Sequence, residues 1–254
     1  MDAETHRLDL RIAVPPADRP HDPVECRPVV DGRDLLGRVP FDSRAAEPER
    51  LLGPDGLLHA AEEPREVRLA ESECGAECCG AVDVTIRREG SQVCWGDWRN
   101  PAGGTLALPE LCFDAGQYAA EVDRAGADHA WEWPARTTAR LLAARLRERT
   151  DWQAAHTCEL QAVVSGTWAR DQVLVLLVHP NLAAVGGDLP WLQFKQSFPV
   201  TDQDPAVRAA ALEALLTADD PRETFEVCGG TREFAEELGY PWPGPRRAAR
   251  PSAS

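Results

Sequence analysis

The sequence predicts an α+β fold in which a mainly antiparallel β-sheet packs with three to four helices. Apolar and polar residues alternate in several short segments, which is typical of strands with one buried face. Amphipathic helical patterns follow near residues 116–125, 134–149 and 204–215. The order of strands, helices, strands and a helix favours this class over a doubly wound parallel fold, in which strands and helices alternate.

The first expected strand covers residues 8–14, where apolar residues alternate with charged or small ones, namely Leu8, Leu10, Ile12 and Val14. Pro15 and Pro16 end this strand. The segment that continues to about Pro64 is rich in Pro, Gly and Asp, so it is expected to form loops with short elements.

A three-stranded antiparallel meander is predicted at about residues 66–98. Its alternating apolar residues are Val67 and Leu69, then Val82, Val84 and Ile86, then Val93 and Trp95. A turn centred on Glu89 and Gly90 joins the second strand to the third. Counting outward from this turn pairs Thr85 with Cys94.

The C-terminal half supplies further strands and the strongest helices. Strands are expected at residues 158–164, 172–178 and 192–198, and the second of these is apolar at nearly every position, as in a central strand covered on both faces. Pro134 opens a helix whose predicted buried residues are Ala139, Leu142, Ala143 and Leu146. Asp204 and Pro205 start another, with a predicted buried face of Val207, Ala211, Ala214 and Leu215.

These elements are expected to form a single composite α+β domain over residues 1–240. The alternative is a division near residue 109 into a β-rich N-terminal part and an α/β C-terminal part. Residues 241–254, with the sequence PWPGPRRAARPSAS, are expected to be a disordered tail.

The composition excludes several classes of function. The chain has 42 Asp and Glu against 27 Lys and Arg, a net charge of −15, which repels nucleic-acid phosphates and anionic lipids. No run of about 18 apolar residues occurs, so no membrane span is predicted. The acidic start MDAETHRLDL is unlike a secretion signal, so we expect a cytoplasmic location, where most of the eight cysteines stay reduced.

Cys74, Cys78 and Cys79 lie in the connection between the first two strands of the meander and are candidate zinc ligands. A structural zinc site takes four thiolate or imidazole ligands, usually from two closely spaced pairs. The pattern C-x3-CC supplies one such group, so a fourth ligand has to come from elsewhere, for example from His59, His129, His156 or His179. Cys94 is expected on the order of 13 Å from the cluster, too far to complete it.

Two other interpretations of this cluster remain open. Cys74 and Cys79 flank a tight connection, so they could form a redox pair, although the three neighbouring glutamates raise the pKa of a thiol. The segment could also be an ordinary turn, in which Gly75 and Gly80 give backbone freedom and the cysteines pack inward.

Several segments, ESECGAECCGAVDVTIRREG, WGDWRNP, WEWPART, PWLQF and EVCGG, resemble a family of uncharacterised cytosolic proteins from high-GC bacteria. The resemblance extends over most of residues 26–230. It implies no activity, no cofactor and no role for any residue.

A binding surface is predicted from Trp98, Trp131, Trp133 and His179. Tryptophan is over-represented at binding surfaces, and Trp98 is expected on the face of its strand opposite to the core residue Trp95. His179 ends the most apolar strand, where side chains often serve function. The alternatives are core packing for the tryptophans and a strand-capping hydrogen bond for the histidine.

No recognised catalytic signature occurs in the sequence. The sequence lacks the G-x-S-x-G, H-E-x-x-H and P-loop motifs. A catalytic arrangement of Cys158, His156 and an acidic residue can be assembled, but any chain with six histidines permits such a combination, so it does not indicate catalysis. The sequence therefore favours a non-enzymatic cytosolic binding or accessory protein, whose acidic surface suits a basic protein partner. The alternative is a metal- or thiol-dependent enzyme, or a redox protein, that uses Cys74, Cys78 and Cys79. Zinc is the candidate cofactor, and the sequence establishes none with certainty.

Overall fold

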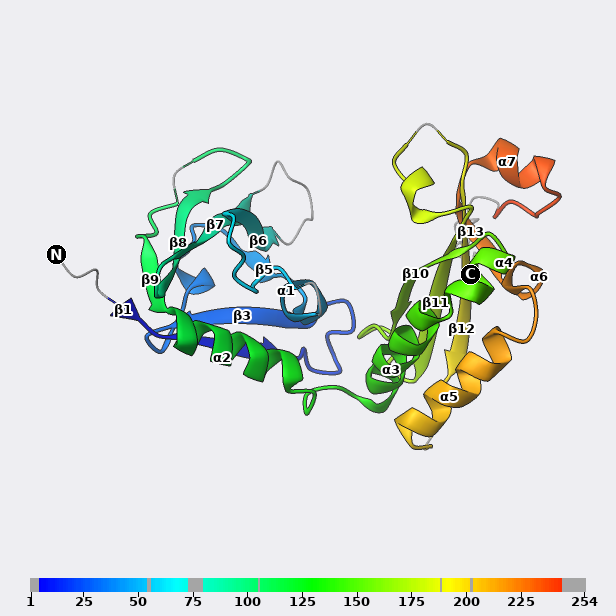
Figure 1. Cartoon of the computed structure of the whole chain (residues 1–254), viewed down its shortest axis with the longest axis horizontal. Coiled ribbons are helices and arrows are strands. Elements are labelled where there is room, and N and C mark those ends of the chain that lie inside the picture. Colours follow the sequence, from blue (N-terminus) through cyan, green and yellow to red (C-terminus); the bar gives the residue numbers. More distant parts are fainter. Residues whose placement is uncertain are drawn as a thin grey trace, which may run out of the picture. The chain divides into compact units, whose positions relative to one another are not determined.

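The computed structural model describes residues 5–53, 56–72, 80–104, 106–187, 189–201 and 203–243. It contains two compact units, Met1–Trp131 and Glu132–Ser254, which are called unit 1 and unit 2 (Figure 1). Both units combine mainly antiparallel sheets with helices, so the predicted α+β class is confirmed. No helix in these residues is long and apolar enough to cross a membrane. The predicted tail lies outside the described residues from residue 244 onward.

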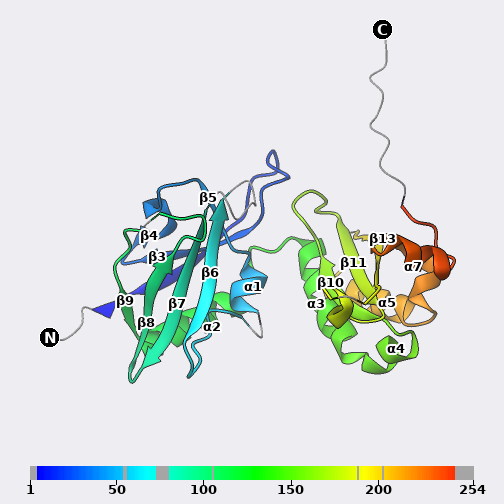
Figure 2. The ribbon, with the colours of Figure 1, turned by 90° about the horizontal axis from the view of Figure 1, so that it is seen from above.

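Unit 1 contains a six-stranded sheet in the order β1-β9-β8-β7-β6-β5. Its strands are β1 (Thr5–His6), β5 (Ser43–Ala45), β6 (Arg65–Ser72), β7 (Ala81–Glu89), β8 (Gln92–Arg99) and β9 (Leu111–Asp114). Strand β1 pairs with β9 in parallel, and the other neighbours are antiparallel. The predicted meander is confirmed as β6, β7 and β8, which lie side by side in Figure 2.

The turn between β7 and β8 corrects the predicted register. Gly90 and Ser91 are the central turn residues, one position later than predicted, and Cys94 consequently faces Arg87 instead of Thr85. Gly90 has a φ of +60°, the left-handed conformation that a II′ turn requires at its first central position. The glycine therefore sets the register of the hairpin.

A second sheet in unit 1 has the order β2-β3-β4. Its strands are β2 (Leu8–Ala13), β3 (Glu25–Val30) and β4 (Arg33–Asp34), and the helices of this unit are the 3-10 helix η1 (Leu36–Arg38), α1 (Pro48–Leu52) and α2 (Ala115–Ala127). The predicted first strand is thus confirmed as β2. Both sheets and both α-helices contribute to one core, which includes Leu8, Leu51, Leu69, Trp95, Phe113 and Tyr118.

Unit 2 contains an antiparallel sheet in the order β10-β11-β12-β13. Its strands are β10 (Glu159–Val164), β11 (Gln172–His179), β12 (Leu192–Pro199) and β13 (Glu226–Gly230). Its helices are α3 (Pro134–Glu148), α4 (Thr150–Ala155), the 3-10 helix η3 (Leu182–Ala184), α5 (Pro205–Leu216), α6 (Pro221–Thr224) and α7 (Arg232–Glu237). Helix α3 packs against α5, β10 and β11, around a core that includes Leu142, Leu146, Val175, Leu177 and Phe194 (Figure 1).

Strand β11 lies between β10 and β12, as predicted for the most apolar strand. Val173, Val175 and Leu177 are fully buried, whereas Leu174 and Leu176 on the other face are only partly buried. The second face of this strand is therefore covered less completely than its sequence predicts.

Helix α5 begins as predicted but buries a different face. The Asp204 side chain accepts hydrogen bonds from the backbone at the start of the helix. Val207 and Leu215, predicted to be buried, are 62% and 60% exposed, and the buried residues are Ala209, Leu212 and Leu216. Ala and Leu occur nearly all round this helix, so apolar spacing does not select one face. In the observed orientation Glu213 forms ion pairs with Arg145 of α3 and with Arg149, the residue that follows α3.

Candidate binding surfaces

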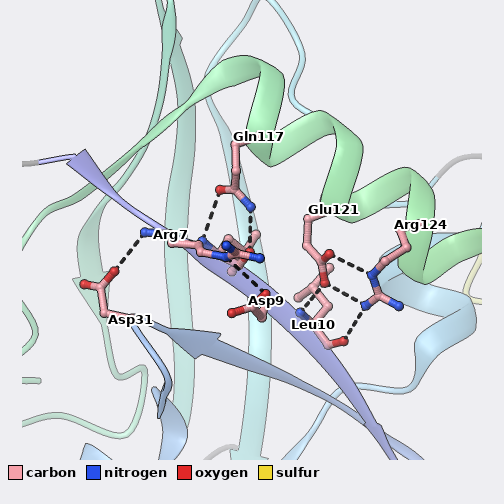
Figure 3. Close-up of polar contacts among 8 residues, drawn as sticks. Arg7, Asp9, Leu10, Asp31, Gln117, Glu121 and Arg124 are labelled. Carbon is pink, nitrogen blue, oxygen red and sulfur yellow. Dashed lines mark hydrogen bonds and ion pairs between the residues drawn. The ribbon is translucent and has the colours of Figure 1, made fainter.

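A cluster of polar side chains on α2 covers the open edge of β2 (Figure 3). Gln117 accepts a hydrogen bond from Leu8 N at 3.2 Å and donates one to Leu8 O at 2.7 Å. Glu121 accepts from Leu10 N at 2.6 Å, and Arg124 donates to Leu10 O at 3.0 Å. Arg124 also binds Glu121 at 2.7 Å. Side chains thus replace a neighbouring strand in satisfying the backbone of β2, so this cluster is structural.

The predicted zinc ligands Cys74, Cys78 and Cys79 lie outside the described residues. The residues on either side of the segment are joined, since Ser72 N donates a hydrogen bond to Gly80 O at 2.9 Å. In the described ranges, no group of three or more His, Cys, Asp or Glu side chains is arranged to hold a metal ion. The zinc site therefore stays a prediction.

Elemental analysis of untagged protein, purified without chelator, tests this prediction directly. A zinc site at the cluster predicts about one equivalent of metal, which disappears in the Cys78→Ser variant because a structural site needs all of its thiolates. Cys228→Ser, at a free and partly buried cysteine of unit 2, is the matched control. A wild-type protein without metal, or a metal content that both variants keep, would contradict the zinc hypothesis.

The histidines considered as a fourth ligand are divided between the units. His59 and His129 belong to unit 1, and His156 and His179 to unit 2. His179 ends β11, where its Nδ1 lies 2.7 Å from Thr157 O. Its ring also stacks on a phenylalanine, with 5.8 Å between the ring centroids. These contacts are those of a histidine that caps a strand.

Cys94 and Cys112 form a disulfide between directly opposed residues of β8 and β9. Their Cα atoms are 4.1 Å apart, and both side chains are buried. The expectation of reduced thiols is therefore wrong for this pair, whereas Cys26, Cys158 and Cys228 are free. This bond, and not distance alone, excludes Cys94 as a zinc ligand.

Cys158, His156 and Asp220 come near one another at the start of β10. His156 Nδ1 lies 3.6 Å from the Asp220 carboxylate, which also binds Arg222 at 2.6 Å. Burial raises the pKa of the Cys158 thiol to about 11, so the thiol is neutral at pH 7. A neutral, buried thiol is a poor nucleophile, and the geometry does not support Cys-His-Asp catalysis.

Trp98 packs toward the core of unit 1, contrary to the predicted facing. Its ring meets Trp95 edge-on, with 6.3 Å between centroids, and its indole N–H donates to Pro109 O at 2.8 Å. Asp97 has a φ of +49°, and the β7–β8 pairing shifts at this point. Such a bulge adds one residue to β8, so Trp95 and Trp98, which are three positions apart, lie on the same face of the strand.

The other predicted surface tryptophans lie close to the boundary between the units in the sequence. The indole N–H of Trp131, in unit 1, donates to a nearby backbone carbonyl at 2.8 Å. Trp133, in unit 2, donates to Ser165 Oγ at 2.9 Å. The guanidinium groups of Arg136 and Arg170 lie 5.1 and 5.0 Å from the Trp133 ring centroid, in cation–π contact.

The loop between β10 and β11 presents the side chain of Trp168, which is 63% exposed. Its ring lies against Gly166, where an added Cβ would collide with the indole. Ala169 N donates to Gly166 O at 3.1 Å, and Ser165 and Thr167 are buried, so the loop is well anchored. The sequence analysis did not select Trp168 as a binding residue. The only feature of the sequence that could have indicated its exposed position is Gly166, two positions earlier.

Exposed apolar side chains and acidic charge are distributed unequally between the units. The exposed large apolar residues of unit 2, within the described ranges, are Trp168, Leu182, Val185, Leu189, Val207, Leu215 and Leu238, whereas unit 1 contributes Val14. By sequence, unit 1 has 26 Asp and Glu against 14 Arg, and unit 2 has 16 against 13 Lys and Arg. Most of these exposed apolar side chains thus belong to unit 2, and most of the acidic surplus belongs to unit 1.

Comparison of the chain with models of protein families, with curated proteins and with solved structures found no match.

Proposed function

We propose that the protein is a non-enzymatic, cytoplasmic binding or accessory protein that holds a protein partner with a basic surface. The observation that carries this proposal is the exposed indole of Trp168, held in place on Gly166. An anchored aromatic side chain gives a large contact area and loses little conformational freedom on binding. Tryptophan is also enriched among the few residues that dominate binding energy.

The acidic surplus of unit 1 supports a partner rich in Lys and Arg. Unit 1 carries 26 acidic residues against 14 arginines, while unit 2 is nearly balanced. Complementary charge speeds the encounter of two proteins and rejects partners of like charge. In this proposal, the negative charge of unit 1 attracts the basic partner, and the exposed apolar side chains of unit 2 make contact with it.

A disulfide in a cytoplasmic protein has to resist cellular thiols. Cys94 is fully buried and Cys112 is 7% exposed. Thiol–disulfide exchange requires access of the attacking thiolate to a sulfur atom, so burial protects this bond. The cytoplasmic part of the proposal is consistent with the disulfide on these grounds.

The Trp168→Ala variant is expected to bind the partner about 30-fold more weakly, equivalent to about 2 kcal/mol, because a central tryptophan anchor is lost. The partner is first captured from native lysate, then purified, and its dissociation constant is measured for both forms. Its sequence is expected to be basic. The thermal unfolding midpoint should stay unchanged, since Trp168 is mostly exposed.

Val14→Ala is the control, because Val14 is an exposed apolar residue of unit 1, outside the unit that is proposed to make the apolar contact. This variant should keep wild-type affinity. Raising the salt concentration should slow association and leave dissociation nearly unchanged, as expected for electrostatic steering. The proposal fails if no stoichiometric protein partner is captured, or if a purified partner binds wild type and Trp168→Ala equally well.

A further inference from the structure

A cavity of about 380 Å³ opens in unit 1 between the loop before β3, the edge strand β5, the start of α1 and strand β6. Its ionisable lining residues are His21, Arg44, Glu47, Arg50, Arg68 and Glu71. Small-molecule sites in proteins measure about 300–1,000 Å³, so this cavity is large enough for a ligand. The cavity beside Tyr118, at about 120 Å³, is much smaller.

Three arginines converge on this cavity, although unit 1 holds 26 acidic residues against 14 arginines. Arg68 is fixed by two hydrogen bonds, at 2.8 and 3.2 Å, to the buried carboxylate of Asp83. Arg44 lies 3.6 Å from the Asp22 carboxylate. Two of the three guanidinium groups are thus paired with carboxylates that do not line the cavity, and Arg50 is the third.

Arg50 and His21 are available to a ligand. Neither side chain makes a hydrogen bond or an ion pair with a described residue, and both are exposed at the cavity. Glu71 stands opposite Arg44 in the pairing of β5 with β6, and its carboxylate is likewise without a partner in the described part of the chain. The cavity thus offers cationic donors together with two carboxylates, those of Glu47 and Glu71.

We propose that this cavity binds a small molecule through an oxyanion, a phosphate or a carboxylate group, with Arg50 and Arg44 as the principal donors. The planar fork of a guanidinium group matches the oxygen spacing of both anions. Arg68, held by Asp83, adds fixed positive charge. Glu71 can accept a hydrogen bond from a hydroxyl or amine group of the same molecule. This site is independent of the partner surface proposed for unit 2.

Titration of the full-length protein with inorganic phosphate and with citrate, at constant ionic strength, tests the site by calorimetry or amide NMR shifts. We expect one of these anions to bind saturably at one site. Arg50→Gln should weaken that binding about tenfold or more, since a charge-assisted hydrogen bond is lost. Glu71→Gln should tighten it, because a negative charge leaves the cavity, and a purely structural role would not produce this gain.

Arg38→Gln is the matched control, since Arg38 is an exposed arginine of unit 1 that does not line the cavity. It changes the net charge as Arg50→Gln does and should leave the affinity unchanged. Preference for phosphate over citrate, or the reverse, identifies the ligand class. The proposal is overturned if neither anion binds saturably, or if Arg38→Gln and Arg50→Gln weaken binding equally. Unchanged thermal unfolding of both variants without anion shows that they are folded.

Discussion

Removal of the Cys94–Cys112 disulfide is expected to lower the free energy of unfolding by about 3 kcal/mol. The bond closes a loop with a sequence separation of 18 residues. A cross-link of this length restricts the unfolded chain, and the chain-entropy model gives about 3 kcal/mol for it. The measurement is urea unfolding of the Cys94→Ala/Cys112→Ala double variant beside wild type, both without reductant.

Reduction provides the control for this result. With strong reductant, wild type should lose most of its advantage over the double variant, because the same cross-link is then open. Cys228→Ser, which removes a free and partly buried thiol, should unfold like wild type. Reaction of all eight cysteines with a thiol reagent in denatured, unreduced wild type would contradict the disulfide.

The strands of unit 1 were predictable because alternation of apolar and polar residues has a strong physical cause. A strand with one buried face shows this period directly, as Leu8 and Leu10 of β2 and the residues of β6 to β8 do. Details that depend on the backbone angles of single residues could not be predicted as reliably as the strands themselves. Gly90 moved the β7–β8 turn by one position, and the bulge at Asp97 turned Trp98 toward the core.

Features that depend on tertiary pairing left little signal in the sequence. The disulfide requires β9 to be a strand and to pair with β8, and neither Cys94 nor Cys112 shows this alone. The face of α5 was mispredicted because Ala and Leu lie nearly all round it, so contacts with α3 decide the orientation. The exposure of Trp168 likewise follows from its loop, since a tryptophan in a sequence is read first as a core residue.

The polar cluster on α2 illustrates the same limit for charged residues. Gln117, Glu121 and Arg124 follow one another at helical spacing, a pattern usually assigned to the solvent side of a helix. Here they face the edge of β2, because that strand lacks a neighbouring strand on this side. The role of these side chains as hydrogen-bond partners of the β2 backbone can be recognised only when the position of the open β2 edge is known.

Substitution of Glu121 with alanine is expected to lower the free energy of unfolding by about 2 kcal/mol at pH 7. The Leu10 N–H, which donates to Glu121 at 2.6 Å, would be left without an acceptor in a buried position. A buried donor without a partner costs about 1–3 kcal/mol. Arg124 would also lose the carboxylate that it binds at 2.7 and 2.8 Å. Urea unfolding of wild type and Glu121→Ala measures the difference.

The contribution of Glu121 should also depend on pH, in a direction set by its pKa. Burial raises this pKa, but hydrogen bonds from Arg124 and Leu10 N outweigh burial, so the folded-state pKa lies below the ordinary value. The ionised form is thus favoured by folding, and its stabilising effect is complete above the unfolded pKa of about 4.3 and is lost as pH falls through the folded value. The stability gap between wild type and Glu121→Gln should therefore shrink from pH 7 toward pH 3.

The glutamine variant separates the charge from the hydrogen bond. Glu121→Gln keeps an acceptor for Leu10 N and loses only the charge that binds Arg124, so at pH 7 it should lie between wild type and Glu121→Ala. Arg147→Gln, at an exposed arginine of α3 in unit 2, controls for a change of one charge elsewhere. A gap between wild type and Glu121→Gln that stays constant from pH 7 to pH 3 would show that the ionised carboxylate does not hold α2 on β2. The loss of stability in Glu121→Ala would then come from the hydrogen bond to Leu10 N and from packing.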